Sequence, residues 1–151
     1  MTTILYDHEA RQIAVDGRTT CGNQILCESS KKWLKDGDDY WFICGSVCDQ
    51  ERLMTQIKSA DSADAPKWKI EASAFLVSGG KVYQCVVCDD GEPAKSLCEY
   101  SDSMGSGGVY ALAALDHGKS AKQAVKYAMT RDAGTGGKVR VFDVDKMEFV
   151  K

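Results

Sequence analysis

Short runs of alternating apolar and polar residues dominate the first third of the chain and predict β-strands. Thr2 to Tyr6 and Arg11 to Val15 flank the polar turn Asp7 to Ala10, which is typical of a hairpin. Antiparallel pairing about this turn places Thr2 across from Asp16, or one residue away. Three further strands are expected nearby. They are Gln24 to Cys27, Lys32 to Lys35 and Tyr40 to Cys44.

Helical spacing of apolar residues occurs in three segments of the chain. These are Cys48 to Lys58, Gly107 to His117 and Ser120 to Thr130. Gly118 suits the C-terminal stop of one helix, and Ser120 with Gln123 forms a capping box for the next. The small polar segment from Ser59 to Pro66 is expected to be a loop.

The remaining β-prone segments complete the expected order of elements. They are Ala72 to Val77, Lys81 to Val87, Ser96 to Tyr100, Lys138 to Phe142 and Lys146 to Val150. The order is strands, helix, strands, two helices, strands, which favours an α+β fold with two sheets packed face to face between helical layers. With 151 residues, no repeat and no internal boundary, residues 1–151 are expected to form a single domain.

Composition narrows the range of partners and compartments. The chain has 19 basic and 22 acidic residues, and no block of five Lys or Arg could follow a phosphate backbone, so nucleic acid is not expected as a partner. No secretory signal precedes the first strand, and no apolar run approaches the roughly 20 residues that cross a membrane. We therefore expect a cytoplasmic protein whose 7 cysteines are reduced.

The first residues carry a candidate nucleophile. Removal of Met1 is expected because the Thr2 side chain is small, and it would leave Thr2 with a free amine beside its own hydroxyl. Such an amine has an ordinary pKa of about 7.7–8.0 and can act as the base that activates the hydroxyl. Many proteins begin with Met-Thr without being enzymes, so this feature alone is not specific.

Several segments together resemble one known family. The quoted segments are Thr2-Thr3-Ile4, Ala14-Val15-Asp16-Gly17-Arg18, Gly22-Asn23, Lys31-Lys32, Cys44-Gly45-Ser46-Val47-Cys48-Asp49, Gly105-Ser106-Gly107-Gly108-Val109-Tyr110-Ala111 and Arg131-Asp132-Ala133-Gly134-Thr135-Gly136-Gly137. They resemble, in the same order, segments of proteasome β-subunits and of their bacterial homologue HslV. The resemblance implies a four-layer αββα sandwich of the N-terminal-nucleophile (Ntn) hydrolase type.

The same resemblance implies catalytic roles for seven residues. Thr2 would be the nucleophile, and Lys32, held by Asp16, would lower the pKa of the Thr2 amine by its charge. Gly45 would donate its backbone N–H to the oxyanion. Three polar residues would position the amine and a water molecule. They are Ser106, Asp132 and Thr135.

The resemblance also implies a substrate pocket and partners. The residues matched to the pocket for the side chain before the scissile bond are Thr19, Ser30, Ile43 and Val47. The expected activity is that of a threonine endopeptidase acting on polypeptides without metal or cofactor. A homo-oligomer is expected, for which a ring is one arrangement, and an unfoldase ATPase partner is left open.

One departure from the family keeps other functions open. Family members carry two long helices after the glycine turn at Gly45, whereas the segment from Val47 to Ile70 has room for one helix and a loop, so the first helical layer is expected to be shortened. This region contributes to ring contacts. Two alternatives therefore remain, a binding or scaffold protein without proteolysis and an Ntn amidase acting on a small amide.

Two other segments have features of a metal site or a phosphate site. Cys85 and Cys88 have the spacing of a zinc knuckle, but in a strand residues three apart point to opposite faces, which favours core cysteines. The turn Gly105 to Gly108 precedes a helix and could cradle a phosphate. It lacks the Lys-Ser/Thr ending of a P-loop, which argues against nucleotide binding there.

Overall fold

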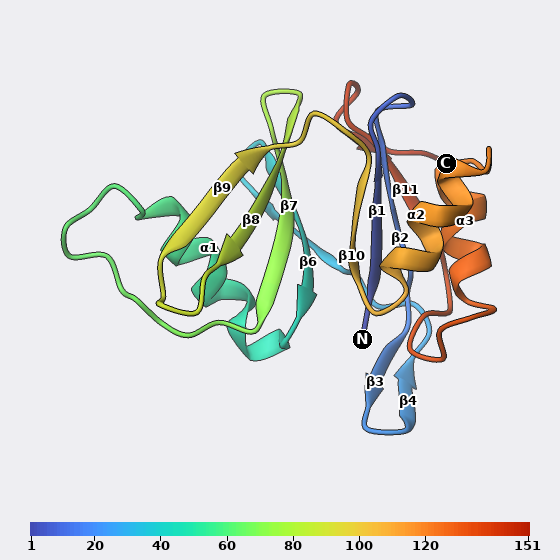
Figure 1. The fold of residues 1–151 in the computed structure, drawn as a ribbon, viewed down its shortest axis with the longest axis horizontal. Coiled ribbons are helices and arrows are strands. Elements are labelled where there is room, and N and C mark those ends of the chain that lie inside the picture. Colours follow the sequence, from blue (N-terminus) through green and yellow to red (C-terminus); the bar gives the residue numbers. More distant parts are fainter.

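The computed structural model describes residues 1–151 and contains two five-stranded antiparallel sheets (Figure 1). The first sheet has the strand order β10-β1-β2-β11-β12. Its strands are β1 (Thr3–Asp7), β2 (Gln12–Val15), β10 (Asp102–Gly105), β11 (Arg140–Asp143) and β12 (Glu148–Phe149). The central strand β2 is buried between β1 and β11, so its apolar residues face the core on both sides of the sheet.

The second sheet follows the chain order β5-β6-β7-β8-β9. Its strands are β5 (Trp33–Asp36), β6 (Asp39–Gly45), β7 (Ala72–Ser78), β8 (Lys81–Val87) and β9 (Pro93–Leu97). A separate two-stranded hairpin, β3 (Thr19–Cys21) and β4 (Gln24–Cys27), extends away from the body of the molecule in Figure 1.

Helices cover the outer face of each sheet. The helical segments are η1 (Val47–Asp49), α1 (Gln50–Lys58), α2 (Gly108–Asp116) and α3 (Ala121–Ala128). In Figure 1, α2 and α3 lie beside the first sheet and α1 lies beside the second. The single helix α1 confirms the expected shortened helical layer. None of these helices has the length and apolar character needed to span a membrane.

Three apolar clusters hold the layers together and define the four-layer αββα architecture. The cluster around Phe42, Phe75 and Phe142 fills the space between the sheets. A second, built on alanines such as Ala111 and Ala124, joins α2 and α3 to the first sheet, since small side chains let helices approach closely. The third packs Leu53 of α1 against the second sheet. The predicted α+β fold with a four-layer αββα arrangement is confirmed.

The predicted hairpin at the N-terminus has a register that matters for the site. Ile4 pairs with Val15, and the backbone N–H of Asp16 donates to the carbonyl oxygen of Thr3 over 3.2 Å. Asp16 therefore lies across from Thr3, one residue from Thr2, within the predicted range. The predicted capping box of Ser120 with Gln123 is also present at the start of α3.

The strand boundaries near residue 100 were predicted wrongly. A strand was expected from Ser96 to Tyr100, whereas β9 runs from Pro93 to Leu97 and β10 follows. Proline is tolerated at the start of an edge strand such as β9. Strand β10 has few β-prone residues and forms because β1 offers a partner, so its own sequence gave little signal. Strand β3 was also not predicted, because its 3 residues are too few to show an alternating pattern.

Candidate active site

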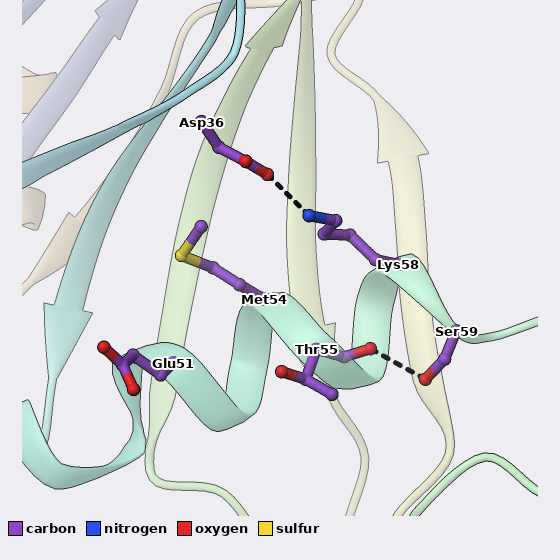
Figure 2. Close-up of a pocket in the computed structure, with 6 residues that line it drawn as sticks. All are labelled: Asp36, Glu51, Met54, Thr55, Lys58 and Ser59. Atoms are coloured by element: carbon purple, nitrogen blue, oxygen red, sulfur yellow. Dashed lines mark hydrogen bonds and ion pairs between the residues drawn. The ribbon is translucent and has the colours of Figure 1, made fainter.

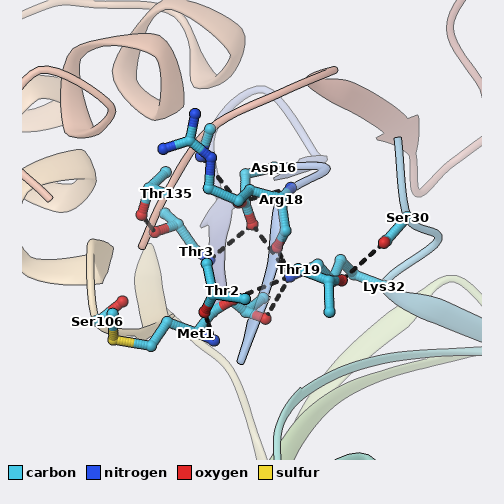
Figure 3. A network of polar contacts seen from close by, with 12 residues as sticks. Met1, Thr2, Thr3, Asp16, Arg18, Thr19, Ser30, Lys32, Ser106 and Thr135 are labelled. Carbon is cyan, nitrogen blue, oxygen red and sulfur yellow. Dashed lines mark hydrogen bonds and ion pairs between the residues drawn. The ribbon is translucent and has the colours of Figure 1, made fainter. Parts of the chain in front are cut away.

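The side chains of Thr2 and Lys32 are in contact at the N-terminal end of β1, as Figure 3 shows. Lys32 lies just before β5, and its ammonium Nζ donates to Thr2 Oγ1 over 2.7 Å. It also donates to the carbonyl oxygens of Met1, at 3.0 Å, and Arg18, at 2.5 Å. Three acceptors match the three N–H donors of a charged lysine. The lysine side chain is only 8% exposed.

Asp16 completes this buried group. Its carboxylate Oδ1 lies 3.8 Å from Lys32 Nζ, and its side chain is fully buried. Backbone N–H groups donate to it from Thr3 at 2.9 Å, Gly136 at 3.1 Å and Arg18 at 3.2 Å. The carboxylate therefore ties β1, the segment after β2 and the segment before β11 to one point (Figure 3).

Burial disfavours the charged forms of both Lys32 and Asp16. Burial lowers the pKa of Lys32, and the nearby Asp16 carboxylate opposes that shift. Burial also raises the pKa of Asp16, against the N–H donors and Lys32. Each group is the counter-charge of the other, so their pairing favours the charged form of both. Loss of either one leaves the other buried without a partner.

A second polar chain ends on Thr3 instead of Thr2. The hydroxyls of Ser106 and Thr135 donate to Asp132 Oδ2 over 2.7 and 2.5 Å. Thr135 Oγ1 lies 2.6 Å from Thr3 Oγ1. Burial alone would raise the pKa of the Asp132 carboxyl, but the hydrogen bonds from Thr135, Ser106 and the Gly134 N–H bring it below its usual value.

Thr2 opens onto a cleft of about 530 Å³. Its walls include Thr19, Ser30, Gly45 and Val47 as well as Lys32. The hydroxyl of Thr19 donates to Ser30 Oγ over 2.7 Å, which closes one side with polar groups. Val47, the first residue of η1, is 71% exposed and also lines the cleft.

Ile43 does not line this cleft, which corrects the predicted pocket. Its side chain is 1% exposed and packs with Trp41 and Leu53 between the second sheet and α1. Successive residues of β6 face opposite sides of the sheet, so Ile43 shares the α1 face with Trp41. Without Ile43, the lining of the cleft is mostly polar.

Glycines shape the backbone on both sides of Thr2. Gly45 has φ +104°, and a Cβ there would collide with the carbonyl oxygen of Glu71. Gly105 has φ +88°, and a Cβ there would overlap the carbonyl oxygen of Thr2. β10 can therefore pair closely with the start of β1 only because residue 105 has no side chain.

We expect Gly105→Ala to destabilise the protein more than Gly118→Ala. Gly118 has the same φ of +88° but nothing within 4 Å of the added Cβ. The control should cost about 1 kcal/mol for left-handed strain, and Gly105→Ala about 1–3 kcal/mol more for the clash. Urea unfolding of both variants measures the difference. Equal costs would contradict the close approach to Thr2.

Met1 is present in this structure and is bonded to the Thr2 nitrogen. It is 59% exposed, and its peptide bond to Thr2 occupies the nitrogen that would serve as a base. The Met1 ammonium lies 3.5 Å from Thr20 Oγ1, and its side chain rests against Gly134. The methionine is thus accessible from solvent over more than half of its surface.

The other sequence candidates occupy different surroundings. Around Gly107, the space that a phosphate would need is filled by the hydroxyls of Thr3 and Thr135, with Asp132 beside them. Cys85 is buried and Cys88 is exposed, so they point apart as predicted. No group of three His, Cys, Asp or Glu residues is arranged to hold a metal ion.

The structure adds residues that sequence reasoning did not select. Arg18 contributes its backbone carbonyl to Lys32 and its N–H to Asp16, and Gly136 contributes an N–H. Backbone groups leave no trace in side-chain patterns. Thr3 could have been found, because the hairpin register that places Asp16 near Thr2 allows Thr3 as its direct partner.

A second hollow of about 490 Å³ lies along α1 and is separate from the cleft at Thr2 (Figure 2). Lys58 spans it with an ion pair of 2.7 Å to Asp36. Ser59 donates its hydroxyl back to the carbonyl oxygen of Thr55. These contacts are intrahelical or on the surface, and no nucleophile with a neighbouring base is present among them.

Comparison with known proteins identifies the fold. No protein-family model and no curated protein sequence matches the chain. Among solved structures, eukaryotic HslV from Trypanosoma brucei aligns with a TM-score of 0.69 and 20% identity over 94% of this chain and 99% of that one. Thiobacillus denitrificans BPH, solved in complex with epoxomicin, aligns with a TM-score of 0.69 and 17% identity over 93% and 97%.

Proposed function

We propose that this protein, whose fold is that of HslV, is a threonine-type peptidase with Thr2 as its N-terminal nucleophile. The observation that carries the proposal is the contact of Lys32 Nζ with Thr2 Oγ1 at 2.7 Å, beside buried Asp16. The two similar solved structures, one of which contains epoxomicin, support it. A lysine and a carboxylate buried together at the start of a chain are costly to fold and have an evident use in chemistry.

The proposed reaction begins once Met1 has been removed. The free Thr2 amine takes the proton of its own hydroxyl, and Oγ1 attacks the carbonyl carbon of a peptide bond. The positive charge of Lys32 lowers the pKa of the amine, so more of it is neutral and able to act as base. The amine then passes its proton to the leaving amine, and water hydrolyses the acyl-enzyme.

Other residues act around this centre in the proposal. The Gly45 N–H donates to the oxyanion, and Asp16 keeps Lys32 charged and oriented. Ser106 and Thr135 act through Asp132, and their chain reaches the site through Thr3. Thr19 and Ser30 line the substrate cleft with hydroxyls, so we expect a small or polar side chain before the scissile bond.

Removal of Met1 is the first testable consequence. It would free one N–H of Lys32, now used by the Met1 carbonyl oxygen, and create the amine beside it. Intact-mass measurement on protein purified from its native host is expected to show a chain lighter by one methionine. Complete retention of Met1 there would rule out the peptidase and favour a binding or scaffold role.

Self-association is the second testable consequence of the proposal. The β3–β4 hairpin exposes Ile25 by 52% and Leu26 by 62% on a projecting segment, where apolar side chains gain from burial by a neighbour. We propose a homo-oligomer that acts on polypeptides. Light scattering at micromolar concentration should report a multimer, and Ile25→Ser with Leu26→Ser should weaken it. A wild-type monomer would instead favour the small-amide alternative.

A further inference from the structure

A pocket of about 400 Å³ lies where β11 and β12 meet the start of α3 and β5, away from the cleft at Thr2. Its polar lining is basic, with Lys122 from the first turn of α3, Lys138 from the segment before β11, and Arg140 from β11. Its apolar wall includes Trp33 and Phe149. No Asp or Glu side chain lines it.

The three cations have no acidic partner. The seven ion pairs of the protein involve other lysines and arginines, although the chain as a whole has a formal charge of -3. Lys122 and Lys138 are exposed, so their side chains can turn toward a ligand. Like charges around one hollow repel each other, and a multivalent anion relieves that repulsion.

Arg140 is fixed in place as one wall of the pocket. Its guanidinium donates to the carbonyl oxygens of Ser30 and Ser29, each at 3.1 Å, and lies 5.3 Å from the centre of the Trp33 ring. Five N–H donors are available on a guanidinium, so donors remain for a ligand. Its position is set before any ligand arrives, which lowers the entropy cost of binding.

The apolar wall adds to the binding of an anion. The Trp33 and Phe149 rings pack at a centroid distance of 4.4 Å and exclude water from one side of the pocket. Charge interactions strengthen where water is displaced. Lys151 also lines the pocket with a basic side chain.

We propose that this pocket binds an oligophosphate, either inorganic or carried by a nucleotide. The cations come from separate elements and surround one hollow, a geometry that suits a compact multivalent anion better than an extended acidic peptide or a nucleic-acid strand. The aromatic wall offers a surface for a nucleobase if the phosphate chain belongs to a nucleotide. The site is distinct from the glycine turn at Gly107.

Isothermal titration calorimetry on the full chain tests the proposal, with tripolyphosphate, ATP and hexaglutamate as probes at about 50 mM salt. The test variant is Lys122→Gln with Lys138→Gln. The matched control is Lys69→Gln with Lys126→Gln, which removes the same charge from exposed positions that do not line the pocket. All four positions are exposed, so folding is expected to be unaffected.

Saturable binding of tripolyphosphate is expected, weakened about tenfold or more in the test variant and less than about twofold in the control. Tighter binding of ATP than of tripolyphosphate would assign the site to nucleotides, and equal binding to the phosphate chain alone; both support the proposal. Absence of saturable binding, equal loss in both variants, or equally tight binding of hexaglutamate would overturn it.

Discussion

Lys32→Ala is expected to abolish reaction of Thr2 with an epoxyketone while the wild type reacts. The variant removes the only side chain that donates to Thr2 Oγ1 and the positive charge that would lower the pKa of the Thr2 amine. Removing general-base activation of a nucleophile typically costs about 10²–10⁴-fold in rate. Labelling over time, followed by intact mass, measures the effect.

Two further variants make the Lys32 result specific. Lys32→Arg should also fail, because a planar guanidinium does not replace a compact ammonium held by three oxygen acceptors. Lys35→Ala, at an exposed lysine of β5, the strand that follows Lys32, should react like the wild type. Circular dichroism verifies folding of each. If folded Lys32→Ala reacts as fast as the wild type, Lys32 has no part in the chemistry.

Asp16→Ala is expected to lower the free energy of unfolding by about 3–5 kcal/mol. The change leaves Lys32 buried without a counter-charge and takes away the acceptor of three backbone N–H groups. Asp16→Asn keeps the size and one acceptor oxygen, so its loss should be smaller. Urea unfolding of the three proteins at one pH gives the comparison.

The matched control for Asp16 is the surface pair that spans the hollow in Figure 2. Asp36 and Lys58 lie closer together than Asp16 and Lys32, at 2.7 Å, but both are exposed. Because water screens an exposed pair, Asp36→Ala should cost less than about 1 kcal/mol. Similar losses for Asp16→Ala and Asp36→Ala would show that the buried carboxylate is not a structural anchor.

Local sequence signals predicted those parts of the fold that local physics decides. Alternation and a polar turn gave the β1–β2 hairpin and placed Asp16 within one residue of its true partner, Thr3. The Ser120 capping box was predicted because its partners lie within one helical turn. Strand β10 depends on pairing with β1, far away in sequence, and the pattern within residues 102–105 could not show it.

The side chains of the candidate site could be selected from the sequence, whereas its backbone contacts could not. The resemblance to proteasome subunits selected the side chains that the structure brings together, Thr2, Asp16 and Lys32. Some contacts of the site are made by backbone groups, such as the Arg18 carbonyl oxygen and the Gly136 N–H. Every residue type has these groups, so the sequence does not show which of them reach the site. Ile43 could not be excluded from the sequence alone, because both faces of β6 are buried and only the structure shows that Ile43 and Trp41 share the face toward α1.

The central claim is that Thr2 becomes an N-terminal nucleophile. Peptide mapping by tandem mass spectrometry, after reaction of native-host protein with an epoxyketone, tests it most directly. We expect a chain that begins at Thr2 and carries one adduct, located on that residue. An adduct on a cysteine instead, or an unmodified Thr2 in protein from which Met1 has been removed, would contradict the account.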